Sequence, residues 1–195
     1  MTTTTVTTQH IPVMPAEVLN ALRPHPGGHY IDGTAGGGGH TALLLEESAP
    51  DGQVLAVDAD PQALERIAAR LSNLRATGRL TLARGNFASL QSIAASAGFA
   101  QVDGILLDLG LSSDQLADRE RGFSFVADAP LDMRFDPAQP ASAADLLNTL
   151  SESELADLLW RYGEERRSRQ IARRIVQARA RQPLTRTEQL AQLAA

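Results

Sequence analysis

Asp32-Gly-Thr-Ala-Gly-Gly-Gly-Gly-His40 joins a short apolar segment to a helical one, and the expected order of the other elements builds on this glycine-rich turn. The preceding segment, His29–Asp32, is typical of a strand, and residues 41–46 continue as a helix. Glycine at 36–39 lets the backbone pass close to a ligand in conformations that a Cβ atom forbids. A loose turn is the alternative, but a run of glycines costs ordering entropy without contributing packing. The pattern therefore predicts a strand, a ligand-binding loop and a helix in succession.

Strands and helices alternate along the chain on both sides of this loop. Further helices are expected at 15–22, 61–74 and 88–97. Further strands are expected at 53–58, 79–84 and 102–109. The last of these is almost uninterruptedly apolar, which indicates a strand buried on both faces. Strands separated by helices of this length predict an α/β fold with a parallel, doubly wound sheet.

The pattern changes after Gly110. Residues 111–140 contain three prolines and little periodicity, so mostly loop is expected. Later helices are expected at 143–150, from Ser151 onward, around 164–181 and from 185–188 onward. Glu154 follows Ser151 by three residues, the spacing of a capping box at the start of a helix. The predicted organisation is a flexible polar N-terminus at 1–9, an α/β domain at 10–110, a connecting loop region at 111–140 and an Arg-rich helical region at 141–195.

The composition excludes several classes of protein. The 195 residues are 43% hydrophobic and 21% charged, which suits one globular domain with a modest extension. The absence of cysteine excludes disulfides and thiolate metal sites, and no metal site is expected. The absence of lysine excludes Schiff-base chemistry and the lysine of a P-loop. Without a signal peptide or an apolar run long enough to span a bilayer, a cytoplasmic protein with no membrane partner is expected.

The charge is divided unevenly along the chain. The net charge is −5, but residues 161–195 contain nine Arg against three Glu, or +6. The first 160 residues contain nine Arg against twenty acidic residues, or −11. This division indicates different partners for the two parts. The sequence does not indicate an oligomeric state.

The acidic residues at the strand ends narrow the identity of the ligand. A nicotinamide dinucleotide is the rival, because 37–42 can be fitted to a GxGxx(G/A) pattern. Asp32, however, would face the pyrophosphate of a dinucleotide. S-adenosylmethionine has no phosphate and carries an ammonium and a sulfonium group, which a carboxylate attracts. Asp58 and Asp108 end further strands, although Asp58 alone is also explained as a helix cap and Asp108 as a turn former. Together the three acids favour an S-adenosylmethionine site.

Several longer strings resemble one family, the bacterial 16S ribosomal RNA (cytosine-N4)-methyltransferases, which modify a cytosine near the ribosomal P site. They are His10–Met14, Tyr30–His40, Asp58–Pro61, Gly104–Ser113, Arg121–Phe125, Pro130–Arg134 and Tyr162–Arg166. Arg-Gly-Phe-Ser-Phe and Pro-Leu-Asp-Met-Arg are the most specific, and the resemblance runs in order from His10 to Ala195. It implies a Rossmann-like class I methyltransferase sheet, an inserted helical domain after the fourth strand, and 16S rRNA in the small ribosomal subunit as the partner.

The resemblance also implies which residues contact S-adenosylmethionine. These are Gly38, Gly39, His40, Asp58, Phe87, Asp108 and Gln115. Phe87 would place an apolar face beside the adenine, although without the resemblance it is better explained as a core aromatic. No catalytic residue can be carried over from other amino-methyltransferases. Their polar-Pro-Pro-aromatic string is replaced here by Asp108-Leu-Gly-Leu-Ser-Ser113, which leaves Asp108 and Ser112 as candidate proton acceptors.

The Arg-rich helix is the expected RNA-facing element. On a helical wheel Ile171, Ala172, Ile175 and Ala178 share one side. Arg166, Arg169 and Arg173 lie opposite, with Arg167, Arg174 and Arg181 on the flank. The alternative is a solvated helix face paired with the acidic first part of the chain. The resemblance favours RNA.

The chain departs from the family pattern at its end. Members of the family return from the helical insert and add strands that complete the sheet, whereas this sequence stops inside the insert. A four-stranded sheet with the fourth strand as an open edge is therefore expected. A truncated chain is expected to bind the cofactor without being an active enzyme. The alternatives are an NAD-dependent oxidoreductase and a non-catalytic RNA-binding fragment.

Overall fold

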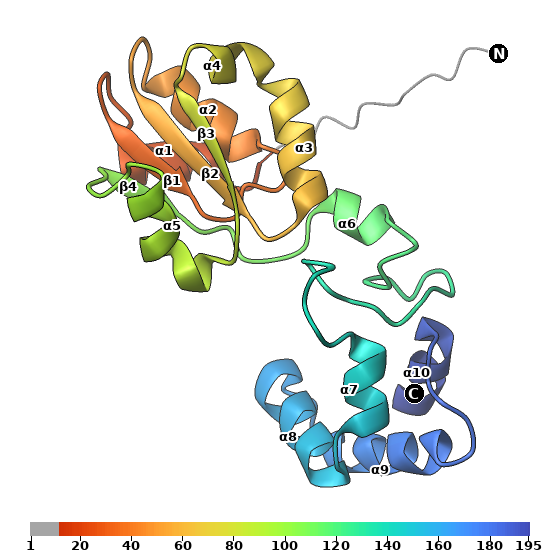
Figure 1. Cartoon of the computed structure of the whole chain (residues 1–195). Coiled ribbons are helices and arrows are strands. Elements are labelled where there is room, and N and C mark those ends of the chain that lie inside the picture. The colour runs from red at the N-terminus through yellow and green to blue at the C-terminus, as the bar shows by residue number, and fades with distance from the viewer. Residues whose placement is uncertain (1–11) are drawn as a thin grey trace, which may run out of the picture. The chain divides into compact units, whose positions relative to one another are not determined.

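A computed structural model describes residues 12–195 of the chain, except the side chain of Ser113 (Figure 1). The expected flexible segment 1–9 and His10 lie outside the described residues. The chain divides into two compact units, one ending at Ser112 and the other beginning at Ser113.

The first unit is built on a parallel sheet, as the sequence predicts. Its strands are β1 (His29–Asp32), β2 (Gln53–Asp58), β3 (Leu80–Arg84) and β4 (Gly104–Leu106), in the spatial order β3-β2-β1-β4. The register pairs Ile31 with Leu55 on one side and with Ile105 on the other. The expected α/β class is confirmed.

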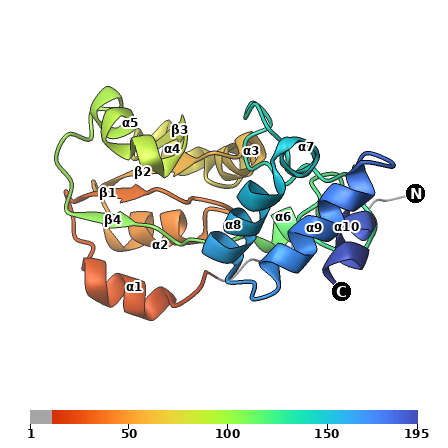
Figure 2. The ribbon, with the colours of Figure 1, turned by 90° about the horizontal axis from the view of Figure 1, so that it is seen from below.

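Helices cover both faces of this sheet. They are α1 (Pro15–Leu22), α2 (Gly39–Glu47), α3 (Pro61–Arg70), α4 (Ser72–Ala76) and α5 (Leu90–Ser96), with a 3₁₀ turn η1 (Phe87–Ser89) before α5. Side chains alternate between the two faces along each strand, because successive strand residues point to opposite sides. Tyr30 packs with residues of α1 to α4, and its neighbour Ile31 packs with α5. Figure 2 shows α1 and α5 on opposite sides of the sheet.

Three expected elements of the first unit were wrong in part. The helix expected at 61–74 is interrupted at Leu71, whose backbone leaves the helical region and whose side chain is buried in the core. The helix expected at 88–97 begins as the 3₁₀ turn η1, where the Asn86 side chain accepts a hydrogen bond from the Ala88 N–H. The strand expected at 102–109 is limited to Gly104–Leu106 and is not buried on both faces, since Ile105 is 49% exposed. It lies at the edge of the sheet, as expected for a four-stranded sheet.

The second unit is helical. It contains α6 (Ser113–Ala117), α7 (Ala143–Thr149), α8 (Glu152–Gly163), α9 (Ser168–Arg179) and α10 (Thr187–Ala194). Residues 111–140 are mostly without regular structure, as expected, apart from the short helix α6. The expected helix around 164–181 is shorter, because α8 runs on to Gly163 and a left-handed residue, Glu164, ends it. The capping box between Ser151 and Glu154 is confirmed.

A hydrophobic core of its own holds the helical unit together. Ile171, Ala172 and Ile175 of α9 are buried in it together with Leu155 of α8, which confirms the predicted inner side of the Arg-rich helix. Leu131, from the long segment between α6 and α7, also lies in this core.

Two of the family-specific strings hold the long segment between α6 and α7 in place. The Leu131 N–H donates to the carbonyl oxygen of Thr185 at 2.9 Å, and the Met133 N–H donates to that of Arg121 at 2.8 Å. The Asp132 carboxylate pairs with the Arg134 guanidinium at 2.6 Å. The strings Arg121–Phe125 and Pro130–Arg134 therefore include contacts that build the helical unit.

Candidate cofactor site and Arg-rich helical pocket

The glycine loop follows β1 and ends in the first turn of α2. Gly36 has φ +51° and Gly38 has φ +76°, a region of backbone conformation that favours glycine. A Cβ atom at Gly38 would also lie 3.0 Å from the Ile67 side chain, and one at Gly39 would lie 3.2 Å from Pro12. Glycine is therefore required at Gly36 and Gly38 by the backbone conformation, and it is favoured at Gly39 by close packing.

Asp58 fixes the loop against the end of β2. One carboxylate oxygen accepts a hydrogen bond from the Gly36 N–H at 2.7 Å, and the other accepts one from the Asp60 N–H at 2.8 Å. Burial raises the pKa of this carboxyl group, and the two backbone N–H donors partly offset that rise. The helix-cap explanation for Asp58 was wrong, because the cap of α3 is Asp60, which accepts from the Gln62 N–H. Each oxygen of Asp58 keeps further acceptor capacity for a ligand hydroxyl.

Asp32 lies beneath the loop rather than on its surface. The side chain is 1% exposed and accepts hydrogen bonds from the Thr41 hydroxyl at 2.7 Å and the Thr34 N–H at 3.3 Å. Burial, partly offset by these bonds, raises its pKa to about 6, and the charges of Asp58 and Asp108 add to the rise. The three carboxyl groups therefore share one electrostatic environment, which attracts a cation and repels a pyrophosphate.

Asp108 and His40 meet at the same loop. The Asp108 N–H donates to the Thr34 hydroxyl at 2.6 Å, and its carboxylate lies 3.8 Å from Nε2 of His40. The Asp108 side chain is 41% exposed, whereas His40 is 7% exposed at the start of α2. The exposed carboxylate of this pair is the one that a ligand can reach.

Phe87 lies after β3, at the edge of the sheet that carries the loop. Its side chain is 42% exposed, so the core-aromatic explanation was wrong. A Cβ atom placed on Gly33 would lie 3.7 Å from the Phe87 Cβ and 2.6 Å from the Leu107 side chain. Phe87 therefore borders the loop and presents a free aromatic face.

The carboxyl ends of the four strands thus bring together most of the predicted contact residues, namely Gly38, Gly39, His40, Asp58, Phe87 and Asp108. Gln115 lies in α6 of the helical unit, where it is 5% exposed. Thr34 and Thr41, which bind the acidic residues, were not predicted. The sequence pattern that could have predicted them is a residue with a hydroxyl group on each side of the glycines.

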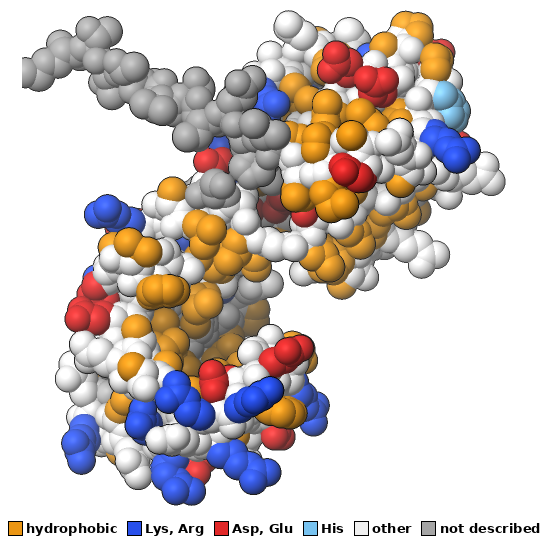
Figure 3. Space-filling model, turned by 180° about the vertical axis from the view of Figure 1, so that it is seen from behind, with side chains coloured by type: hydrophobic (Ala, Val, Ile, Leu, Met, Phe, Trp, Pro, Cys, Tyr) orange, Lys and Arg blue, Asp and Glu red, His pale blue; other side chains and the backbone are white. Residues whose placement is uncertain are grey.

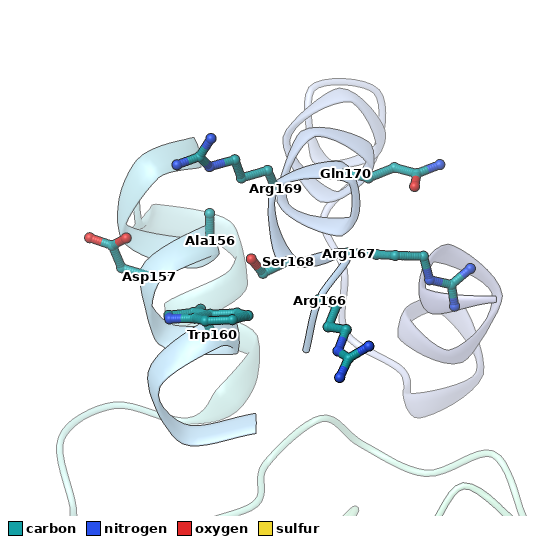
Figure 4. Close-up of a pocket in the computed structure, with 8 residues that line it drawn as sticks. All are labelled: Ala156, Asp157, Trp160, Arg166, Arg167, Ser168, Arg169 and Gln170. Atoms are coloured by element: carbon teal, nitrogen blue, oxygen red, sulfur yellow. The ribbon is translucent and has the colours of Figure 1, made fainter. Parts of the chain in front are cut away.

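A pocket of about 520 Å³ lies in the helical unit, between α8 and the start of α9 (Figure 4). It is lined by Ala156, Asp157, Trp160, Arg166, Arg167, Ser168, Arg169 and Gln170. Figure 3 shows Lys and Arg side chains gathered on this unit; all of them are Arg, since the chain has no Lys. The contribution of Trp160 was not predicted, because one aromatic residue on a short helix gives no pattern.

Several of the arginines on this unit are already bound. Arg173 pairs with Glu152 at 3.5 Å, Arg186 pairs with Asp128 at 2.8 Å, and Arg179 donates to the Leu147 carbonyl oxygen at 2.6 Å. Arg167 donates to the carbonyl oxygens of Ala194 and Ala195, both at 3.3 Å. Such contacts occupy part of the basic surface within the unit itself.

Two further features concern residues 12–195. They contain no cluster of three or more His, Cys, Asp or Glu side chains arranged to hold a metal ion. None of their helices is both long enough and apolar enough to cross a bilayer.

Comparison with known proteins gives a consistent picture. Residues 7–195 match a family described as the MraW methylase family. The protein named Ribosomal RNA small subunit methyltransferase H from Thermomicrobium roseum is 56% identical over 190 residues, which cover 97% of this chain and 58% of the relative. Its namesake from Syntrophotalea carbinolica is 53% identical over 185 residues, covering 95% and 58%. The chain therefore spans less than two thirds of the length of these curated relatives.

A solved structure is more distantly similar. The C-terminal domain of precorrin-6Y C5,15-methyltransferase from Rhodobacter capsulatus is 19% identical, with a TM-score of 0.40, over 60% of each chain.

Proposed function

The chain belongs to the MraW methylase family, and we propose that it is the cofactor-binding part, with the start of the substrate-binding part, of an S-adenosylmethionine-dependent methyltransferase. The substrate that we propose is small-subunit ribosomal RNA, methylated at N4 of a cytosine near the P site. An enzyme with this substrate acts in the bacterial cytoplasm. The observation that carries the cofactor assignment is the group of three carboxyl groups around the glycine loop.

The charges and shapes at the loop fit S-adenosylmethionine. The carboxylates of Asp58 and Asp108, with buried Asp32 beneath them, attract its ammonium and sulfonium groups. The N-terminus of α2 suits its carboxylate, because the helix dipole places partial positive charge there. Asp58 has acceptor capacity for the ribose hydroxyls, and exposed Phe87 offers an apolar face to the adenine. A dinucleotide would bring its pyrophosphate against the same negative charges.

The chemistry needs a methyl donor and a proton acceptor. When bound, S-adenosylmethionine supplies a methyl group activated by a positively charged sulfur. Cytosine N4 is a weak nucleophile because its lone pair is conjugated with the ring, so the protein must orient it and accept the proton it loses. Asp108 is a candidate acceptor, since its carboxylate is exposed beside His40. An Asp108→Ala protein that kept full turnover and normal cofactor affinity would exclude it.

Calorimetry distinguishes this cofactor from its rival. S-adenosylhomocysteine is expected to bind the chain, and NAD is not. Asp58→Ala removes the acceptor of the Gly36 N–H and is expected to weaken binding on the order of tenfold. Asp103→Ala is the matched control, because Asp103 precedes β4 and binds the His29 N–H at the other end of the sheet. Binding of NAD without S-adenosylhomocysteine would overturn the proposal.

A methyl-transfer assay tests the activity. Assembled small ribosomal subunits would be incubated with labelled S-adenosylmethionine and either this chain or a chain extended to the length of its relatives. Incorporation into ribosomal RNA is expected with the extended chain. If the extended chain bound S-adenosylhomocysteine but transferred no methyl group to small subunits, the proposed substrate would be wrong.

A further inference from the structure

The pocket between α8 and α9 lies wholly within the helical unit and combines an aromatic face with positive charge. Trp160, the only tryptophan of the chain, is 56% exposed. Figure 4 shows its ring extending from α8 toward α9, beside Ser168. An indole ring exposed in this way is a surface on which a planar group can stack.

The charge at this pocket is available to a ligand. Within residues 12–195, the guanidinium groups of Arg166 and Arg169 form no hydrogen bond or ion pair, in contrast to those of Arg167 and Arg173. Asp157 is the only acidic residue of the lining, and Figure 4 shows its carboxylate directed away from the space between the helices. The lining therefore offers two free guanidinium groups.

The beginning of α9 adds polar donors to the same space. Ser168 is 6% exposed and lines the pocket. Figure 4 shows this hydroxyl facing the gap toward α8. In the first turn of α9 the Ser168 N–H donates to the carbonyl oxygen of Glu165 at 3.0 Å, whereas the N–H groups of Arg169 and Gln170 lack intrahelical partners and favour an anion. A buried hydroxyl, helix N–H groups and arginines together form the donor set that a phosphate requires.

We propose that this pocket binds one unpaired nucleotide of RNA. The base stacks on Trp160, and the adjoining phosphate is held by Arg166, Arg169 and the start of α9. Base stacking on an aromatic side chain, with basic residues along the backbone, is the usual chemistry of single-strand binding. The volume of about 520 Å³ falls in the range of small-ligand sites. This inference rests on the proposed RNA substrate, but it assigns a site separate from the cofactor loop.

Trp160 makes the test specific, because its fluorescence reports on this pocket alone. The chain would be titrated with a short, unstructured oligoribonucleotide and with a hairpin of the same length, while intrinsic fluorescence and the anisotropy of end-labelled RNA are followed. The unstructured RNA is expected to quench Trp160, and the hairpin stem is not. Trp160→Ala should weaken anisotropy-monitored binding on the order of tenfold, whereas Trp160→Phe should retain most of it.

The arginines have a matched control in the same unit. Arg166→Gln and Arg169→Gln should each weaken binding and reduce its salt dependence by about one ion per phosphate contact. Arg119→Gln makes the same charge change just after α6, at an exposed position outside the pocket lining and outside the Arg-rich helix. It should leave binding nearly unchanged. Thermal melting by circular dichroism checks that each variant is folded.

The outcomes separate this site from the proposed function. Equal quenching by the hairpin, or equal weakening by Arg119→Gln and Arg166→Gln, would overturn the pocket assignment. A protein that binds S-adenosylhomocysteine but shows no quenching by RNA loses this site and keeps its proposed cofactor. A protein that is quenched by RNA but binds no S-adenosylhomocysteine keeps this site and loses the proposed methyltransferase function.

Discussion

Asp32 is a buried carboxyl group whose pKa is raised to about 6, mainly by burial. In the unfolded chain the pKa of an aspartate is close to 3.8. The folded state therefore holds this proton more tightly, and its stabilising contribution is complete below about pH 4 and is lost as the pH rises through 6. The shift corresponds to at most about 3 kcal/mol in the free energy of unfolding.

Asp32→Asn is expected to remove this part of the pH dependence. Urea unfolding at several pH values between about 4 and 7 measures the difference in unfolding free energy between wild type and variant. The Asp32→Asn variant should become more stable relative to wild type as the pH rises, because Asn never ionises. Asp157→Asn, at an exposed position on α8, should show no such trend. A constant difference across this range would contradict the raised pKa.

The same carboxyl group predicts how cofactor binding depends on pH. An ionised Asp32 attracts a cation, so the affinity for S-adenosylmethionine should increase as the pH rises through about 6. S-adenosylhomocysteine lacks the sulfonium charge and should show a smaller increase. Calorimetry at pH values on both sides of 6 measures both ligands. Identical pH profiles for the two ligands, or an unchanged profile in Asp32→Asn, would exclude Asp32 as a source of cofactor attraction.

Gly122 shows why the Arg-Gly-Phe-Ser-Phe string requires glycine. Its φ is +68°, and an added Cβ would lie 2.0 Å from the carbonyl oxygen of Pro130. Gly122→Ala is expected to destabilise the helical unit by at least about 2 kcal/mol, because both backbone strain and a steric clash result. Gly163→Ala is the control, since nothing lies within 4 Å of its added Cβ and its φ is not positive. Urea unfolding monitored by Trp160 fluorescence compares the two, and equal effects would contradict this explanation.

For single residues, the sequence predicted correctly those whose place is determined by the order and direction of the strands. Asp58 and Asp108 follow parallel strands, whose carboxyl ends share one edge of the sheet, so their convergence on the glycine loop was predictable. The placement of Asp32 beneath the loop was not, because it depends on hydrogen bonds with Thr34 and Thr41 that form only in the folded loop. The role of Trp160 likewise depends on the packing of α8 against α9.

Among the elements, β4 differs most from its expected form. An apolar run normally indicates burial on both faces, but β4 pairs with β1 alone among the described strands. Ile105 on β4 is 49% exposed, and Leu107 and Leu109 beyond it are 43% and 68% exposed. The apolar composition thus predicted that a strand is present. The length and burial of that strand depend on which segments lie beside it in the fold, and the local sequence pattern does not contain this information. The interruption of the expected helix at Leu71 has a similar origin, since the core contact of Leu71 outweighs helix propensity.

The exposed edge at β4 predicts concentration-dependent self-association. Unpaired backbone groups and apolar side chains on an edge strand template pairing between chains, and a lysine on the strand opposes it. Ile105→Lys should therefore reduce light scattering at high protein concentration while leaving the melting temperature nearly unchanged. Gln101→Lys adds the same charge at an exposed position outside β4 and should have little effect on scattering. Equal scattering by Ile105→Lys and wild type would show that this edge does not drive association.

At the scale of the whole chain, the two units have separate hydrophobic cores. Every cluster of buried hydrophobic residues draws its members from one unit alone, either before Ser112 or after Ser113. The glycine loop lies in the first unit. The arginines of the pocket come from the basic segment 161–195, whereas Ala156, Asp157 and Trp160 of its lining precede that segment. The charge asymmetry was visible in the sequence, but its division at residue 160 does not coincide with the boundary between the units. The second unit as a whole has twelve Arg and thirteen acidic residues, a net charge of −1.

Separate cores predict two unfolding transitions. Calorimetry of the chain should resolve two heat-absorption peaks, and only one of them should coincide with the loss of folded Trp160 fluorescence, because Trp160 lies in the helical unit. S-adenosylhomocysteine at about 100 times its dissociation constant should stabilise the other transition by about 2.7 kcal/mol, since all the predicted contacts except Gln115 lie in the unit with the glycine loop. Trp160→Phe provides the control, because it removes the fluorescence signal without changing the calorimetric peaks. A single peak that the ligand shifts together with Trp160 fluorescence would show that the two cores unfold as one cooperative structure.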